Sequence, residues 1–287
     1  QIQSTIMFSF SLISVSVMLI LGIGMYIRFS AISRQEIIQS TQKLMEQTGE
    51  NLEDYLVNMR QISDAVYYNV IKENDLAGPD NRIRQGMNLL YEANRSRLRS
   101  IAIYNNYGSL MAAEPVALQK EDPDVTKQEW YQKAVGDTAN MHFSIPHIQN
   151  LFDDGMRQYY WVISLSRVVE LTDRGVPLTG VLLVDMDFAD ISRMMKKMNV
   201  SNNGQYYYLC DGSGQIIYHR KQMQIRRGNA AENSVKAARY KDGVYDDYFD
   251  GEHRKVIVNT ISYTGWKLVG IIPDAAFTHD MYDIQYF

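Results

Sequence analysis

Side chains suited to holding a small molecule gather in the middle of the sequence. Some are aromatic and could form stacking walls, and the others carry tips that donate or accept hydrogen bonds. They are Gln128, Trp130, Tyr131, His147, Gln149, Tyr160 and Asp185. Apolar walls with a few convergent polar groups are typical of small-ligand pockets. The set therefore predicts a ligand-binding site.

Each of these residues also has a purely structural interpretation. Trp130 and Tyr131 could instead be the packed core of a short helix. His147 could be an ordinary loop histidine. Asp185 ends a strand-like run, so it could cap a helix beginning at Phe188, although Asp187 is better placed for capping. The sequence leaves these alternatives open.

Catalytic and metal-binding signals are weak. The five histidines (His142, His147, His219, His253, His279) are accompanied by no GxSxG, HExxH, P-loop or GxGxxG motif. Cys210 is the single cysteine, which excludes an intramolecular disulfide and a cysteine-based zinc site. The acids between 242 and 252 lack the spacing of a calcium loop and fit a hairpin with one solvated face. We expect no catalytic residue, no metal and no cofactor in this region.

The charge balance excludes one large class of partner. The 287 residues include 29 Lys and Arg against 33 Asp and Glu, a net charge of −4. Nucleic-acid binding needs a basic patch or stripe, so we expect no nucleic-acid partner.

The positions of those charges are uneven, because residues 1–27 contain none. The apolar run over residues 6–27 is long enough to cross a hydrocarbon core of roughly 30 Å. We predict a transmembrane helix at 1–27. The alternative is a cleaved signal peptide, but no small-residue cleavage site clearly follows before Arg28.

A long amphipathic helix is predicted next, over 28–75. Apolar residues recur every seven positions, at Ile38, Met45, Leu52, Met59 and Val66. This stripe must be buried, either against the same chain or against a second copy as a coiled coil. A turn cluster at 75–80 ends the helix.

The remainder reads as two unequal copies of one strand-rich unit. Hairpin, helix, strand and strand follow one another at 98–198 and again, more briefly, at 205–272. The predicted fold class is α+β. A larger module covers 76–203, a smaller one covers 204–273, and a last helix runs over 274–287.

With these elements in order, the chain resembles the double Cache sensor domains of bacterial transmembrane receptors, particularly those of Gram-positive sensor histidine kinases. The segments that carry the likeness are IAIYNNYGSLMAA, QEWYQKAV, TGVLLVDMDFADI, YYLCDGSGQIIYH and TGWKLVGIIPDAAF. The resemblance implies two PAS-like modules, each with a mainly antiparallel sheet of about five strands. It also implies that the ligand binds the membrane-distal module, 76–203, outside the cell.

The resemblance also bears on the ligand. Trp130, Tyr131 and Asp185 match the pattern of the amino-acid-binding members. Gln128 stands where those members carry the arginine that meets the ligand carboxylate, and His147 and Gln149 replace a Tyr and an Asp. Without the arginine, a neutral solute such as a sugar is expected in place of a free amino acid.

The resemblance further implies a dimer through the stalk helix and a second membrane span just after Phe287. The expected output is a histidine kinase acting on a cytoplasmic response regulator. A chemotaxis receptor or a diguanylate cyclase carrying the same sensor is the alternative, and a membrane-anchored binding module without signalling output is a further one.

Overall fold

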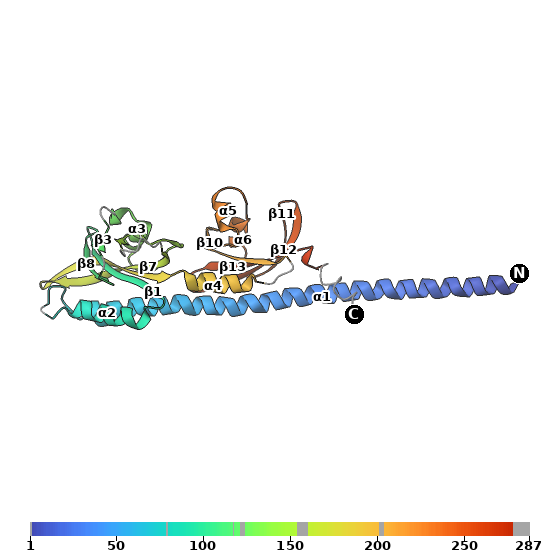
Figure 1. The fold of residues 1–287 in the computed structure, drawn as a ribbon, viewed down its shortest axis with the longest axis horizontal. Coiled ribbons are helices and arrows are strands. Elements are labelled where there is room, and N and C mark those ends of the chain that lie inside the picture. The colour runs from blue at the N-terminus through green and yellow to red at the C-terminus, as the bar shows by residue number, and fades with distance from the viewer. Residues whose placement is uncertain are drawn as a thin grey trace.

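The structure is a computed structural model that describes residues 2–78, 80–116, 118–120, 124–153, 160–200 and 204–277. One helix dominates it: α1 (Ile2–Ala65) continues directly into the π-helical turn η1 (Val66–Ile71). Two sheets lie one after the other along this helix, and its N-terminal part extends well beyond them (Figure 1).

The extended part of α1 has the composition of a membrane span. From Phe10 to Ile27 its large apolar side chains are exposed, and its most apolar window has a mean hydropathy of 2.2 with no residue buried. By length and composition this is the one helix among the described residues that could cross a membrane. The finding fits membrane anchoring, and a signal sequence would have the same composition.

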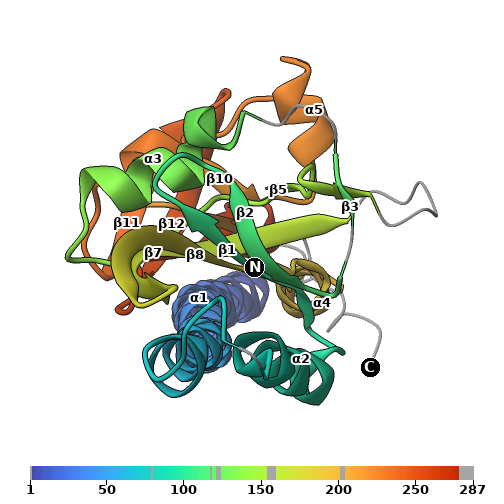
Figure 2. The ribbon, with the colours of Figure 1, turned by 90° about the vertical axis from the view of Figure 1, so that its left-hand side faces the viewer.

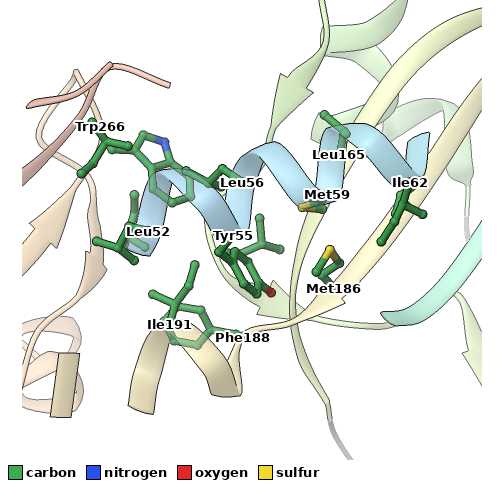
Figure 3. Close-up of a cluster of buried hydrophobic side chains, with 14 of the residues drawn as sticks. Leu52, Tyr55, Leu56, Met59, Ile62, Leu165, Met186, Phe188, Ile191 and Trp266 are labelled. Atoms are coloured by element: carbon green, nitrogen blue, oxygen red, sulfur yellow. The ribbon is translucent and has the colours of Figure 1, made fainter. Parts of the chain in front are cut away.

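Further along, the heptad stripe of α1 packs on the two sheets of its own chain. Met45, Leu52, Leu56, Met59 and Val66 are each at most 1% exposed. Figure 3 shows this contact, with the stripe of α1 between Trp266 of the second sheet and Met186 and Ile191 of the first module. The stripe is therefore buried within one chain over this length, and pairing with a second copy remains a prediction.

Glycine permits a close approach in this contact. A Cβ at Gly49 of α1 would lie 2.7 Å from Oδ1 of Asn259, so a larger residue there would require the Asn259 side chain to move.

The first sheet is antiparallel and follows the order β2-β1-β8-β7-β4, with β5 also paired to β7. Its strands are β1 (Leu98–Asn105), β2 (Leu110–Glu114), β4 (His142–Phe143), β5 (His147–Ile148), β7 (Trp161–Asp173) and β8 (Val176–Asp187). A separate pair is formed by β3 (Leu118–Gln119) and β6 (Phe152–Asp153). The turn between β7 and β8 lies at Arg174 and Gly175, both with positive φ.

The second sheet repeats this path as β10-β9-β13-β12-β11. Its strands are β9 (Tyr206–Cys210), β10 (Ile216–Tyr218), β11 (Gly243–Phe249), β12 (Glu252–Ile261) and β13 (Trp266–Pro273). The predicted α+β fold of a long helix with two antiparallel sheets of about five strands is therefore confirmed. The module boundaries at 76, 203 and 273 remain predictions.

Helices cover both faces of the first sheet (Figure 2). On one face lie α1 and α2 (Arg82–Asn94), and on the other lie η2 (Val125–Lys127) and α3 (Glu129–Gly136). The helix α4 (Ala189–Met198) lies further along α1 and contacts β9 of the second sheet. On the second sheet, α5 (Gln222–Arg226) and α6 (Ser234–Ala238) take the place of α3.

Two helices were not predicted, and one prediction is corrected. The sequence pattern predicted no helix at α2 or α5, although α2 carries a buried i, i+4 pair, Ile83 and Met87. Pro273, expected to open the last helix, is the final residue of β13. The predicted helix over 274–287 falls largely outside the described residues, which end at 277.

Candidate ligand-binding site

Strand register brings three polar side chains into one row on the face of the first sheet that α3 covers. Asp185 of β8 lies opposite Ser100 of β1 on one side and Ser164 of β7 on the other. Alternate residues of a strand share a face, so the next row holds Ala102, Leu183 and Ser166. The site is thus built by three strands from distant parts of the chain.

Asp185 is the centre of this row and is 1% exposed. One carboxylate oxygen accepts a hydrogen bond from the Ser100 hydroxyl at 2.8 Å, and the other accepts one from the Ser164 hydroxyl. Burial raises the pKa of Asp185, while the bond from Ser164, the charge of His147 and the bond from Ser100 act in the opposite direction. Among the described residues, no lysine or arginine forms an ion pair with it.

His147 adjoins Asp185 through Ser164. Its Nδ1 lies 3.0 Å from the Ile145 carbonyl and 3.3 Å from the Ser144 hydroxyl. Its Nε2 lies 3.3 Å from Ser164 Oγ, and the Ser164 hydroxyl donates to Asp185. One hydroxyl thus separates the imidazole from the carboxylate.

A second unusual group on this face is Tyr104 of β1. It is fully buried, and its hydroxyl has no hydrogen-bond partner among the described residues. Burial, with the nearby Asp185 charge, raises the pKa of Tyr104. Its ring lies 5.5 Å from that of Trp130 between centroids. A buried hydroxyl without a partner calls for an explanation, and a ligand polar group would supply one.

The helix α3 holds the two predicted aromatic walls against the sheet. The Ser166 hydroxyl donates to the Trp130 carbonyl at 2.8 Å, and the Tyr131 hydroxyl donates to the Asn105 carbonyl at 3.1 Å. Trp130 and Tyr131 are 4% and 5% exposed and belong to one apolar cluster with Tyr104. They are core residues, and the ring of Trp130 faces the site through Tyr104.

The other predicted residues lie nearby but make mainly backbone contacts. The Gln128 carbonyl accepts from the amides of Tyr131 and Gln132 in the first turn of α3. The Gln149 amide donates to the Tyr160 carbonyl at 2.9 Å. The Tyr160 ring packs beneath the Arg99 guanidinium at 4.4 Å. Their binding roles remain predictions.

The structure separates the roles of the two acids at the end of β8. Asp187 accepts a hydrogen bond from the amide of Ala189, the first residue of α4, at 2.8 Å, and it pairs with Arg99. Asp185 instead points into the sheet face. Capping thus belongs to Asp187, as the sequence suggested, and Asp185 is left for the site.

Sequence reasoning missed Ser100, Ser164 and Tyr104. A signal for Ser164 and Ser166 was present, since both are polar residues in an otherwise apolar strand run, ISLS. Ser100 and Tyr104 join the site only through the pairing of β1 with β8, which local patterns do not reveal. None of the described residues forms a group of three His, Cys, Asp or Glu side chains able to hold a metal ion.

Two antiparallel sheets, each covered by helices, lie along one long helix and form a two-module architecture. Each sheet has a buried face with polar groups at its centre. The family model described as "Cache domain" matches residues 29–281. The chain belongs to this family.

Three similar proteins place the chain further. A probable methyl-accepting chemotaxis protein of Bacillus thuringiensis subsp. konkukian is 22% identical over 275 residues, covering 95% of this chain and 39% of that protein. The ligand-binding domain of the Pseudomonas aeruginosa chemoreceptor PctC, solved with GABA, aligns with a TM-score of 0.60 at 16% identity, covering 82% of this chain and 98% of that one. The ligand-binding domain of the Pseudomonas fluorescens chemoreceptor CtaA, solved with L-isoleucine, aligns at 0.56 and 16%, covering 81% and 90%.

These similarities support only part of what the relatives' names describe. At these identities the solved structures establish the fold alone. The chain spans about two fifths of the length of the Bacillus thuringiensis relative (39%). It is thus a Cache-family sensor domain of the kind found in receptors.

Proposed function

We propose that this chain is the extracytoplasmic ligand-sensing part of a chemotaxis-type membrane receptor, and that its ligand carries a protonated amine. The receptor class is supported by the match to a probable methyl-accepting chemotaxis protein, which covers 95% of this chain and 39% of that protein. The apolar start of α1 supports the membrane anchor. The histidine-kinase output with its response regulator stays an alternative, because no relative described above is a kinase. We propose no catalysis in this region.

One observation carries the ligand class: the fully buried Asp185 carboxylate has hydroxyl and imidazole neighbours but no lysine or arginine partner among the described residues. A buried carboxylate is strongly disfavoured without a counter-charge. A ligand ammonium would supply that charge, and the unpartnered Tyr104 hydroxyl would give it a second polar contact.

This inference replaces the neutral solute expected from the sequence. An uncharged sugar would leave Asp185 without a counter-charge, whereas the ligands named for PctC and CtaA, GABA and L-isoleucine, both carry an amine. The absence of an arginine at Gln128 still applies. We therefore propose an amine whose binding depends less on a carboxylate than that of an α-amino acid.

Isothermal titration calorimetry on the full chain in nanodiscs tests the proposal with matched pairs of compounds. GABA is compared with butyrate, which lacks the amine, and with 4-aminobutanol, which lacks the carboxylate; glucose represents the sugars. We expect the two amines to bind and butyrate and glucose to give no heat. Binding of glucose or butyrate, with no binding of amines, would refute the amine assignment.

The variant Asp185→Asn keeps the shape of the side chain and removes its charge. A charge-assisted hydrogen bond contributes about 1.5–3 kcal/mol, so we expect amine affinity to fall at least about tenfold. Asp187→Asn is the matched control, because Asp187 lies two residues away and caps α4. Equal effects of both variants would show that Asp185 has no special role.

A further inference from the structure

A cavity lies away from the Asp185 face, between the first and second modules. It has a volume of about 500 Å³, within the range of small-ligand sites. Three parts of the chain line it: α1 through Arg60, the first module through residues 133–168, and the β12–β13 turn through Tyr263 and Thr264. We call it the inter-module cleft.

The described lining of this cleft is positively charged. Arg60, Lys133 and Arg167 all line it, and no aspartate or glutamate is among its lining residues. This is unusual in a chain whose net charge is −4. A concave surface lined by one sign of charge concentrates ligands of the opposite sign.

The two arginines are held in place from behind by one carboxylate. Asp64 of α1 accepts from Arg167 Nη1 at 2.6 Å and from Arg60 Nε at 3.3 Å. Arg167 also packs over the Tyr67 ring at 4.9 Å, and its side chain is 13% exposed. A guanidinium has five donors, and Asp64 accepts one from each arginine in these bonds. The pair therefore keeps an excess of positive charge and of donors.

Lys133 adds a third cation at the end of α3. It pairs with Glu129 at 2.6 Å on the exposed surface of α3, with the lysine side chain 45% exposed. Such exposed i, i+4 pairs contribute little to stability. A ligand anion can therefore replace Glu129 as the partner of Lys133 at a small cost in free energy.

Aromatic side chains from both modules form the apolar part of the cleft. The Phe143 ring lies 5.7 Å from the Tyr263 ring and 6.4 Å from the Trp266 ring, each in an edge arrangement. Thr138 and Asn140 add hydrogen-bonding groups. The wall therefore suits the carbon skeleton of a ligand, and the cations suit its charged end.

We propose that the inter-module cleft is a second binding site, which takes a small organic anion with its carboxylate or phosphate on Arg60, Arg167 and Lys133. Its occupant contacts α1 and both modules at once. Binding there favours one relative placement of the modules in proportion to its differential affinity for that placement. This site is independent of the amine site at Asp185.

Calorimetry on the full chain in nanodiscs, at low ionic strength, tests the proposal. The probes are succinate, its uncharged diamide succinamide, and inorganic phosphate. We expect heat from succinate, none from succinamide, and weakening of succinate binding as salt is raised. Binding of phosphate in place of succinate would assign the anion as a phosphate and keep the site. No heat from either anion up to about 10 mM would overturn the proposal, since this corresponds to negligible affinity.

Arg60→Gln and Lys133→Gln locate the site without disturbing the core, because both side chains are about half exposed. We expect each to weaken anion binding about tenfold with an unchanged thermal midpoint. Arg95→Gln is the matched control, an exposed arginine with an i, i+3 partner far from the cleft. Equal weakening by the control would mean non-specific attraction and overturn the assignment. Asp185→Asn should leave anion binding intact, so failure of the amine proposal is distinguishable from failure of this one.

Discussion

At the scale of single residues, burying the ionised Asp185 carboxylate costs free energy of folding. Because burial raises its pKa in the folded state, the folded chain binds a proton more tightly than the unfolded chain between the ordinary aspartate value and the raised one. Stability therefore falls as pH rises through that window and stays reduced above it. His147 and Tyr104 are the titratable neighbours on this face.

Asp185→Asn should remove this dependence. We predict a variant more stable than the parent chain at neutral pH, with a flatter stability curve above the ordinary aspartate pKa of about 3.9. Urea unfolding at a series of pH values measures the difference. Parallel curves for the two proteins would contradict the raised pKa.

Amine binding should respond to pH in the opposite direction. Burial raises the pKa of Asp185, so an ammonium that binds the ionised carboxylate displaces the proton from the protonated form, and affinity rises with pH while the amine stays charged. Calorimetry in two buffers of different ionisation enthalpy detects the released proton. Identical heats in both buffers would exclude it.

The second module fills the corresponding face with its own charges. Arg254 of β12, 5% exposed, donates to Asp247 of β11 and to Glu232, and its Nη1 donates to the Tyr206 hydroxyl at 3.0 Å. Burial alone would raise the pKa of Glu232, but His219, the Arg254 charge and Tyr206 lower it to about 2. Each carboxylate of this network thus has the Arg254 guanidinium as a counter-charge, whereas Asp185 has no lysine or arginine partner among the described residues.

Glu232→Gln should therefore destabilise the chain at neutral pH. A pKa depressed from 4.5 to about 2 corresponds to roughly 3 kcal/mol. That stability is present above about pH 4.5 and lost as pH falls toward 2. Chemical unfolding at pH 7 and pH 3 measures it, with the exposed Glu252→Gln as control. A loss at pH 7 equal to the control's would refute the prediction.

At the scale of elements, α1 forms the common core of both modules. Its stripe packs into one apolar cluster containing residues of both sheets. A helix of this length, exposed at its start and buried further along, forms one continuous element from the apolar N-terminal part to both sheets.

Leu56→Ala tests this role of α1. Leu56 is fully buried beside Trp266 (Figure 3). Truncating a buried leucine costs about 2–5 kcal/mol, and we expect one cooperative transition shifted by that amount, measured by urea unfolding followed by tryptophan fluorescence. Leu89→Ala, at a 72% exposed position of α2, is the control. Two separate transitions in the variant would show that the modules do not share this core.

At the scale of the whole molecule, the exposed apolar start of α1 separates two environments. Apolar residues exposed on every side of a helix are unfavourable in water and suit a bilayer. This asymmetry agrees with a sensor held outside the cell by a membrane anchor.

Removing residues 1–27 should abolish membrane association. We expect the full chain to remain in the membrane fraction after carbonate extraction, and the shortened chain to appear in the soluble fraction with an unchanged thermal midpoint. A full chain found soluble and shortened at its N-terminus would instead indicate a cleaved signal peptide.

The sequence by itself determined the elements whose periodicity is strong. The apolar start, the heptad stripe, both hairpins and the paired strands β7–β8 and β12–β13 follow from local alternation and turn residues. The helix α2, between the turn at 75–80 and β1, was not predicted, although Ile83 and Met87 are buried on one of its faces. Asp185, Trp130 and His147 were predicted as site residues from their chemical type together with their positions in the pattern of the double Cache family.

Tertiary structure alone decided what surrounds those residues. Ser100, Ser164 and Tyr104 reach Asp185 because three strands pair in one register, and such pairing depends on contacts between segments up to about 85 residues apart. The same holds for the inter-module cleft, whose cations come from α1, α3 and β7. Among the described residues, the buried Asp185 carboxylate has no lysine or arginine partner. This depends on its three-dimensional environment, and it is the reason that we propose an amine in place of a neutral solute.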